Sequence, residues 1–370
     1  MIRKMFIILL SFLVYGSTVF AQQENANTSA DIQSVKIAGT QLLKLHSSTT
    51  GRDYELYVNL PRFYNDTTKT FPVIYCLDAQ WDFPLVQSIF GEQYYDGFVP
   101  GAVIVGITWG GINPNYDSLR AKDLTPGPNS AQYGNASNFL KCIKDEIIPF
   151  IESKYRVKKD DKTLIGSSFG GLFTLYTLFT ETKLFNRYIL TSPALTWDNG
   201  IIYKYEKDYA ENNSKLSARV YMAVGGYEDV NTFQKFADII KNQNFEGLKF
   251  QTKVVDGMGH SGGKAEGYSR GMQFVFERPS INVDPKILNQ YAGEYQLSPD
   301  VNVKLAVENN QLVAYVPGDI KIILNAESDK DFYTIGAYGF VHFQKDDSGK
   351  VTGFEMEQYT GKMFIKKIAE

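Results

Sequence analysis

The chain is poor in the residues that bind metals or form disulfides. Its 370 residues include three histidines and two cysteines, Cys76 and Cys142, and these are scattered along the sequence. Zinc sites need three or four such ligands at short spacing, so the sequence predicts no metal, and without a nucleotide-type glycine loop it predicts no cofactor. One disulfide is formally allowed. Because Cys76 lies in an apolar run and Cys142 on an expected helix, two buried, unpaired thiols are favoured.

Strong charge of one sign is also missing. The net charge is -3 and no run of Lys and Arg occurs, which argues against nucleic-acid binding. A short apolar run occurs at the N-terminus, where Arg3 and Lys4 precede residues 5–14 and Val19-Phe20-Ala21 has the small residues that a signal peptidase reads. A membrane anchor is the alternative, and the run is short for a helix that spans a bilayer. We expect residues 1–21 to be a bacterial-type signal peptide, with the cleaved protein exported to the periplasm or secreted and no stable membrane span left.

Short apolar runs alternate with helical stretches between residues 32 and 279, which is typical of a doubly wound, mostly parallel α/β sheet. We expect strands near 41–46, 54–60, 71–77, 101–107, 162–165, 188–191, 219–224 and 250–255, and helices near 85–93, 137–155, 169–179, 232–241 and 265–276. The stretch 108–136 is rich in Gly, Pro and Asn and has no apolar period. We predict a long functional loop there.

A linker near 278–285 separates this part from a C-terminal part in which strands and turns alternate. The helical period stops, and Pro279 and Pro285 bracket a polar stretch. Short alternating segments follow at 303–307, 312–316, 321–324, 332–335, 340–344, 351–358 and 363–368, as in a small antiparallel barrel or sandwich. The sequence thus predicts a catalytic domain over 22–280 and a small all-β, barrel-like domain over 287–370.

Ser168 is the candidate nucleophile. It lies in the GxSxG pentapeptide Gly166-Ser167-Ser168-Phe169-Gly170, between an expected strand and an expected helix. Such a serine sits on a strained strand-to-helix turn, where glycines two positions before and after it let the backbones pass. The helix N-terminus also offers free N–H groups to an oxyanion. The alternative is a glycine-rich helix start, and the strand-turn-helix context favours the nucleophile.

The partners of a serine nucleophile are a histidine base and a carboxylate. His260 follows the last expected strand of the α/β part, where this fold presents its histidine. His46 ends an early strand, and His342 alternates within the C-terminal strands. The carboxylate must follow one strand and precede His260, which leaves Glu228 or Asp229. We favour Glu228, with Asp229 as the cap of the next helix.

An oxyanion hole needs two backbone N–H donors beside the nucleophile. We assign the N–H of Phe169 and, from the loop that ends the strand over residues 71–77, the N–H of Gln80. Ala79 is the alternative to Gln80.

Five stretches resemble the Putative esterase (esterase D-like) family of α/β hydrolases, which includes siderophore esterases, feruloyl esterases, S-formylglutathione hydrolases and mycolyltransferases. They are 54–61 followed by 71–78, then 120–126, 166–171, 191–197, and 224–228 with 259–261. The resemblance implies the α/β-hydrolase fold, the Ser168, Glu228 and His260 triad, and N–H donors at Gln80 and Phe169. Ala79 departs from the glycine usual in this family, and the loop tolerates it if its φ is negative.

The resemblance also bears on the substrate site. In the siderophore-esterase branch the arginine of the RxxDxTP stretch lies by the substrate, which implies that Arg120 binds a carboxylate or catecholate. The alternative, which we favour, is an internal ion pair between Arg120 and Asp123 that braces the loop. Trp81 and Trp197 are candidates for an aromatic wall, with core packing as the alternative. From Tyr291 onward the chain loosely resembles lipocalin-like β modules of secreted bacterial hydrolases, which implies an accessory role.

Together these patterns predict an exported serine carboxylic-ester hydrolase that acts through an acyl-enzyme on Ser168. The substrate is expected to be a small-molecule or glycan-linked ester, and siderophore or feruloyl-type aromatic esters fit an aromatic wall. An acyltransferase that uses the same triad is one alternative, in which an alcohol outcompetes water. A non-catalytic, ligand-binding hydrolase homologue is the other.

Overall fold

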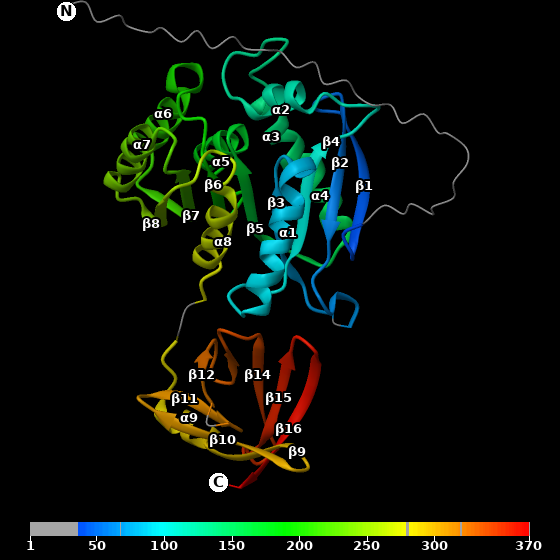
Figure 1. The fold of residues 1–370 in the computed structure, drawn as a ribbon, viewed down its shortest axis with the longest axis vertical. Coiled ribbons are helices and arrows are strands. Elements are labelled where there is room, and N and C mark those ends of the chain that lie inside the picture. The colour runs from blue at the N-terminus through cyan, green and yellow to red at the C-terminus, as the bar shows by residue number, and fades with distance from the viewer. Residues whose placement is uncertain (1–35, 67, 279–280, 319, 370) are drawn as a thin grey trace, which may run out of the picture. The chain divides into compact units, whose positions relative to one another are not determined.

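The computed structural model describes residues 36–66, 68–278, 281–318 and 320–369 (Figure 1). The expected signal peptide over 1–21 lies outside the described residues. Within the described ranges, no helix has the length and apolar character needed to cross a bilayer.

An eight-stranded sheet organises the α/β part, in the order β1-β2-β4-β3-β5-β6-β7-β8. The strands are β1 (Thr40–Ser47), β2 (Arg52–Asn59), β3 (Phe71–Cys76), β4 (Val103–Trp109), β5 (Val157–Ser167), β6 (Arg187–Thr191), β7 (Lys215–Gly225) and β8 (Glu246–Val255). The pairings β1·β2 and β2·β4 are antiparallel, and every pairing from β4 to β8 is parallel. The mostly parallel, doubly wound sheet predicted from the sequence is confirmed.

Helices cover both faces of this sheet (Figure 1). The helices α1 (Ala79–Tyr95) and α8 (Lys264–Val275) pack on one face, where Phe83 and Tyr268 belong to the same buried core. A second core on the other face includes side chains of α3 (Ala136–Cys142), the π-helical turn η2 (Ile143–Ile147), α4 (Ile148–Lys154), α5 (Phe169–Thr180), α6 (Trp197–Ala210) and α7 (Val230–Asn242). Burial on both faces explains why β4 reads as a continuous apolar run.

The prediction of an irregular loop over 108–136 is wrong in its middle. A helix, α2 (Tyr116–Leu124), forms there, and the side chain of Asn115 caps it by accepting a hydrogen bond from the Ser118 N–H at 3.0 Å. Its sequence is mostly polar, with Asp123 and Leu124 as its buried residues, so it shows no apolar period. Helix α6 was also not predicted, because its buried residues are Ile202 and Glu206 and it shows no apolar period. Left-handed backbone at residues 198–200 interrupts its first turn.

Helix α1 begins before the predicted segment, which started after Pro84. Proline inside a helix removes one backbone hydrogen bond, and the buried Phe83 and Val86 on either side stabilise the helix through it.

The C-terminal part is a closed antiparallel barrel in the order β10-β11-β12-β13-β14-β15-β16-β9. Its strands are β9 (Gly293–Ser298), β10 (Val301–Glu308), β11 (Gln311–Val316), β12 (Ile320–Ala326), β13 (Asp331–Tyr333), β14 (Gly339–Lys345), β15 (Val351–Gln358) and β16 (Gly361–Ala369). Tyr295, Phe343 and Phe354 belong to its core. The small all-β domain is confirmed, while the short helix α9 (Pro285–Tyr291) and the closing strand β9 were not predicted.

The two cysteines are buried and unpaired, as predicted. Cys76 ends β3 and Cys142 ends α3. Burial raises the pKa of the Cys76 thiol well above its ordinary value and raises that of Cys142 to about 12. Neither is therefore a thiolate at neutral pH.

Candidate active site

The predicted catalytic residues follow parallel strands at the same edge of the sheet. Ser168 comes directly after β5, Glu228 follows β7 and His260 follows β8, while Asp78 comes just after β3. The carboxyl ends of parallel strands are where open α/β sheets bind ligands.

Ser168 has the backbone of a nucleophile elbow. Its φ of 58° and ψ of -117° lie outside the regions that most side chains adopt, between β5 and α5. A Cβ on Gly166 would lie 2.4 Å from the carbonyl oxygen of Gly170, so only glycine fits at residue 166, the first position of the pentapeptide. The turn is fixed by the Ser168 N–H, which donates to the Thr191 carbonyl at 3.0 Å. Strained backbone of this kind persists where the surrounding structure enforces it.

Glu228 and His260 form a direct contact. Nδ1 of His260 lies 2.5 Å from Oε2 of Glu228. Asp229 instead caps α7, because its carboxylate accepts from the Thr232 N–H at 3.0 Å. The structure therefore brings Glu228, the favoured carboxylate, to the histidine.

The other oxygen of Glu228 is held by two further donors. Its Oε1 accepts from the Ser192 hydroxyl at 2.6 Å and from the Gly225 N–H at 2.8 Å. Burial opposes ionisation of Glu228, but the hydrogen bonds from Ser192, His260 and Gly225 outweigh it and hold the pKa of Glu228 below its ordinary value. Glu228 is thus a carboxylate at neutral pH, suited to accept a hydrogen bond from the Nδ1–H of His260.

Ser168, Glu228 and His260 line one cavity of about 200 Å³. Its wall also includes Leu195 and Phe233. No hydrogen bond joins Ser168 Oγ to His260 among the described residues, and such bonds are often long until substrate binds. The other histidines lie elsewhere, with His46 on Asp53 in the β1–β2 hairpin and His342 on Asp331 in the barrel.

The predicted oxyanion donors lie in the first turns of α1 and α5. Gln80 is the second residue of α1 and Phe169 the first of α5, and the first N–H groups of a helix have no intrahelical acceptor. In the turn between β3 and α1, the residue with a positive φ is Asp78, at 52°, and not Ala79. Alanine is therefore tolerated at residue 79, where the family usually has glycine. A Cβ on Gly170 would lie 3.3 Å from Oδ2 of Asp78, which shows how closely the two helix starts pack.

Arg120 binds Asp78 and not Asp123. Its Nε and Nη2 donate to the two carboxylate oxygens of Asp78 at 2.9 and 2.8 Å. Asp123 is occupied by other donors, among them the Tyr54 hydroxyl at 2.8 Å and Arg52. The predicted alternative of an Arg120 to Asp123 ion pair is therefore wrong. Although burial opposes its charge, the bonds to Asp78 raise the pKa of Arg120.

Aromatic rings surround Arg120 and the start of α5. The Arg120 guanidinium carbon lies 5.7 Å from the ring centroid of Trp81 and 5.3 Å from that of Phe169. The Trp197 ring packs against Phe169 and Tyr133, with centroids 5.0 and 4.9 Å apart. Trp81 is 48% exposed. Both predicted tryptophans thus lie in one aromatic cluster next to the residue that follows Ser168.

The comparison with known families agrees with this geometry. The model of the family described as Putative esterase matches residues 47–262, which is more than half of the chain. The chain belongs to this family.

Individual relatives of this esterase-family chain include siderophore-processing enzymes. It is 29% identical over 211 residues to the ferri-bacillibactin esterase BesA of Bacillus subtilis, which covers 52% of the chain and 72% of BesA. The crystal structure of the BES protein from Bacillus cereus superposes with a TM-score of 0.60 at 26% identity, over 67% of this chain and 99% of that one. An IroE-like serine hydrolase from Shewanella oneidensis gives 0.58 at 25% identity, over 68% and 85%. These similarities support an ester hydrolase.

Sequence reasoning missed two residues of this esterase-family site. Ser192, which binds Glu228, and Asp78, which binds Arg120, were recognised as parts of matching stretches and given no role. Asp78 follows the expected strand over 71–77 and Ser192 follows that over 188–191, and a polar residue after a parallel strand is the signal that could have singled them out.

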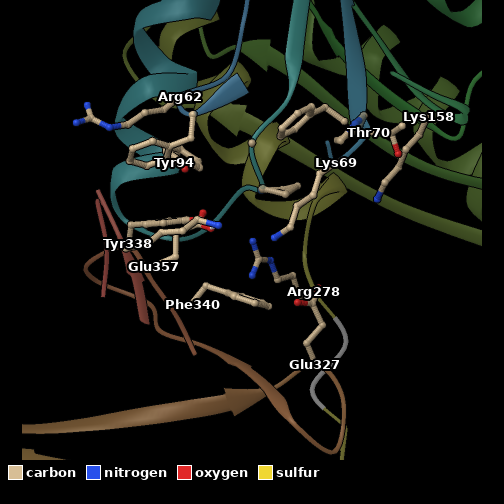
Figure 2. A pocket seen from close by; sticks show the side chains of 16 residues that line it. Arg62, Lys69, Thr70, Tyr94, Lys158, Arg278, Glu327, Tyr338, Phe340 and Glu357 are labelled. Carbon is tan, nitrogen blue, oxygen red and sulfur yellow. The ribbon is translucent and has the colours of Figure 1, made fainter. Parts of the chain in front are cut away.

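A second cavity of about 240 Å³ lies away from Ser168 (Figure 2). Figure 2 shows the side chains of Lys69 and Arg278 extending into it, beside Tyr94 and Tyr338. None of the three predicted triad residues lines it.

Proposed function

We propose that this chain is an exported serine esterase that forms an acyl-enzyme on Ser168. One observation carries the proposal: the 2.5 Å contact between His260 and Glu228 lies in the same cavity as a serine with elbow geometry. Export rests on the signal-peptide pattern of residues 1–21.

The reaction follows from the orientation of the imidazole. With Nδ1 held by Glu228, Nε2 is left to take the proton of Ser168 as Oγ attacks the ester carbonyl. The N–H groups of Phe169 and Gln80 stabilise the oxyanion. His260 then returns the proton to the departing alcohol, which leaves the acyl group on Ser168. Water adds to the acyl-enzyme with His260 as base, and the acid is released.

The substrate we propose is an ester with an anionic or electron-rich aromatic group, of the siderophore type. Arg120 and the rings of Trp81, Phe169 and Trp197 support it, because a guanidinium among aromatic faces suits catecholate and benzoate rings. The esterase BesA is named for a ferri-siderophore, in line with this choice.

The test uses the purified chain without residues 1–21. It is expected to hydrolyse p-nitrophenyl butyrate, to hydrolyse a catecholate ester more efficiently, and to be labelled by a fluorophosphonate at Ser168. Ser168→Ala is expected to lose labelling and to lower kcat by a factor of about 10⁴ or more, while its thermal unfolding stays that of the wild type. Unchanged hydrolysis by Ser168→Ala would refute the proposal. An ester formed faster than free acid when an alcohol is added would indicate the acyltransferase instead.

A further inference from the structure

Ser192 lies beside the triad without belonging to it. It comes directly after β6, the strand between β5 and β7, and lines the same cavity as Ser168, Glu228 and His260. Its side chain is largely buried, and its hydroxyl donates to Glu228 at 2.6 Å.

The backbone of Ser192 is held in an unfavourable conformation. Its φ is 46°, in the left-handed region that favours glycine, and its N–H donates to the Ala223 carbonyl at 2.7 Å. Serine is disfavoured at such a φ, and local strain of this kind commonly accompanies function. The buried hydroxyl supplies the interaction that a glycine could not make.

We infer that Ser192 is a positioning residue. It acts on the triad Ser168, His260 and Glu228 through its hydrogen bond to Glu228. Together with the Gly225 N–H it occupies Oε1 of Glu228, which leaves Oε2 to face Nδ1 of His260. The carboxylate is thereby fixed in rotation, and the imidazole with it. This inference rests on the proposed function of the same site.

Two substitutions separate the effect of the Ser192 hydroxyl on activity from the effect of the strained backbone. Ser192→Ala removes the hydroxyl and keeps a Cβ at the positive φ, whereas Ser192→Gly removes the hydroxyl and relieves the backbone strain. Ser167→Ala is the matched control, because Ser167 is a buried neighbour of the nucleophile whose hydroxyl has no hydrogen-bond partner among the described residues. Both Ser192 variants are expected to lower kcat by a factor of about 10 to 100, as for loss of a hydrogen bond to a charged group, with KM nearly unchanged.

The pH profile gives a readout that a purely structural role would not move. His260 and Asp229 are the titratable side chains that share the cavity with Glu228, and Asp229 points to the α7 cap. The Ser192 hydrogen bond lowers the pKa of Glu228, so its loss is expected to raise that pKa. Protonation of the Glu228 carboxylate should then lower kcat at a higher pH in both variants than in the wild type.

A double-mutant cycle decides whether Ser192 acts through Glu228. In the Glu228→Gln background, Ser192→Ala is expected to change kcat less than twofold. A wild-type kcat for Ser192→Gly would overturn the inference, since the hydroxyl would then be dispensable, and so would an undiminished effect in the Glu228→Gln background. Fluorophosphonate labelling of Ser168 in the wild type is measured alongside, because its absence would refute the proposed function and not the role of Ser192.

Discussion

Arg120 donates two parallel hydrogen bonds to the carboxylate of Asp78, at 2.9 and 2.8 Å. Asp78 directly precedes α1, the helix that carries the predicted oxyanion donor Gln80. The side chain of Asp78 is 3% exposed and that of Arg120 is 14% exposed, so the ion pair is almost completely shielded from solvent. A bidentate pair of this kind fixes the loop geometrically as well as electrostatically. Arg120 therefore holds in place the start of α1, which carries Gln80.

Removal of Arg120 is expected to destabilise the protein. Arg120→Ala leaves the Asp78 carboxylate buried and unpaired, which costs roughly 3–5 kcal/mol in the free energy of unfolding. The control is Lys144→Ala, which breaks a surface pair with Glu181 at 2.9 Å and is expected to cost less than about 1 kcal/mol. Urea unfolding followed by tryptophan fluorescence measures both. Equal midpoints for the two variants would contradict a structural role for the buried pair.

Glu228 and Asp229 are expected to differ sharply in their effect on activity. Glu228→Gln keeps the shape of the side chain but removes the carboxylate that binds His260, and should lower kcat by about 10³ to 10⁴. Asp229→Ala should leave kcat near the wild-type value and cost about 0.5–2 kcal/mol of stability through the lost α7 cap. Steady-state kinetics on p-nitrophenyl butyrate and thermal unfolding separate the two. The reverse pattern would make Asp229 the acid.

Gly225 and Gly259 offer a matched pair of alanine substitutions on the two turns that carry the acid and the base. A Cβ on Gly225 would lie 2.6 and 2.7 Å from the carbonyl oxygens of Met258 and Gly259, so Gly225→Ala must displace the His260 turn. A Cβ on Gly259 meets nothing within 4 Å. Since displacements of about 1 Å can cost about 10² in rate, Gly225→Ala should lower kcat at least tenfold while Gly259→Ala should not. Similar kcat values for both variants would argue against tight packing of these turns.

Glu146 is expected to make stability depend on acid pH. Burial opposes its ionisation, but hydrogen bonds from Ser47, Ser48 and Thr49 lower the pKa of Glu146 to about 2. A carboxylate whose pKa is lower in the folded state stabilises the protein fully above its unfolded pKa, which is about 4.3 for Glu. This contribution is lost as the pH falls toward 2. Glu146→Gln should therefore lower the urea midpoint at pH 7, and the difference from wild type should shrink between pH 4.3 and 2. A difference independent of pH would exclude an ionic contribution.

The positions proposed for the triad could be read from the sequence because each follows an expected strand. The GxSxG motif lies between an expected strand and an expected helix, and Glu228 and His260 follow later strands. These features depend on chain order alone. The structure brings His260 and Glu228 together. The role of Ser192 depends on β6 lying between β5 and β7, and that strand order is a tertiary property. The partner of Arg120 likewise comes from 42 residues away in the chain.

The elements missed from the sequence are those that lack a clean period. The buried residues are Asp123 and Leu124 in α2 and Ile202 and Glu206 in α6, so neither helix shows an apolar stripe. The closing strand β9 has two buried residues, Gly293 and Tyr295, and its pairing with both β10 and β16 stabilises it more than its own pattern does.

The two buried, unpaired cysteines make the folded chain indifferent to the redox state of its surroundings. Cys76 and Cys142 lie on separate elements, and their raised pKa values keep them as unreactive thiols. Folding needs no disulfide isomerase, and reducing agents have no bond to break. The same native state is therefore accessible in a reducing cytoplasm and in an oxidising periplasm, which removes one common obstacle to recombinant production.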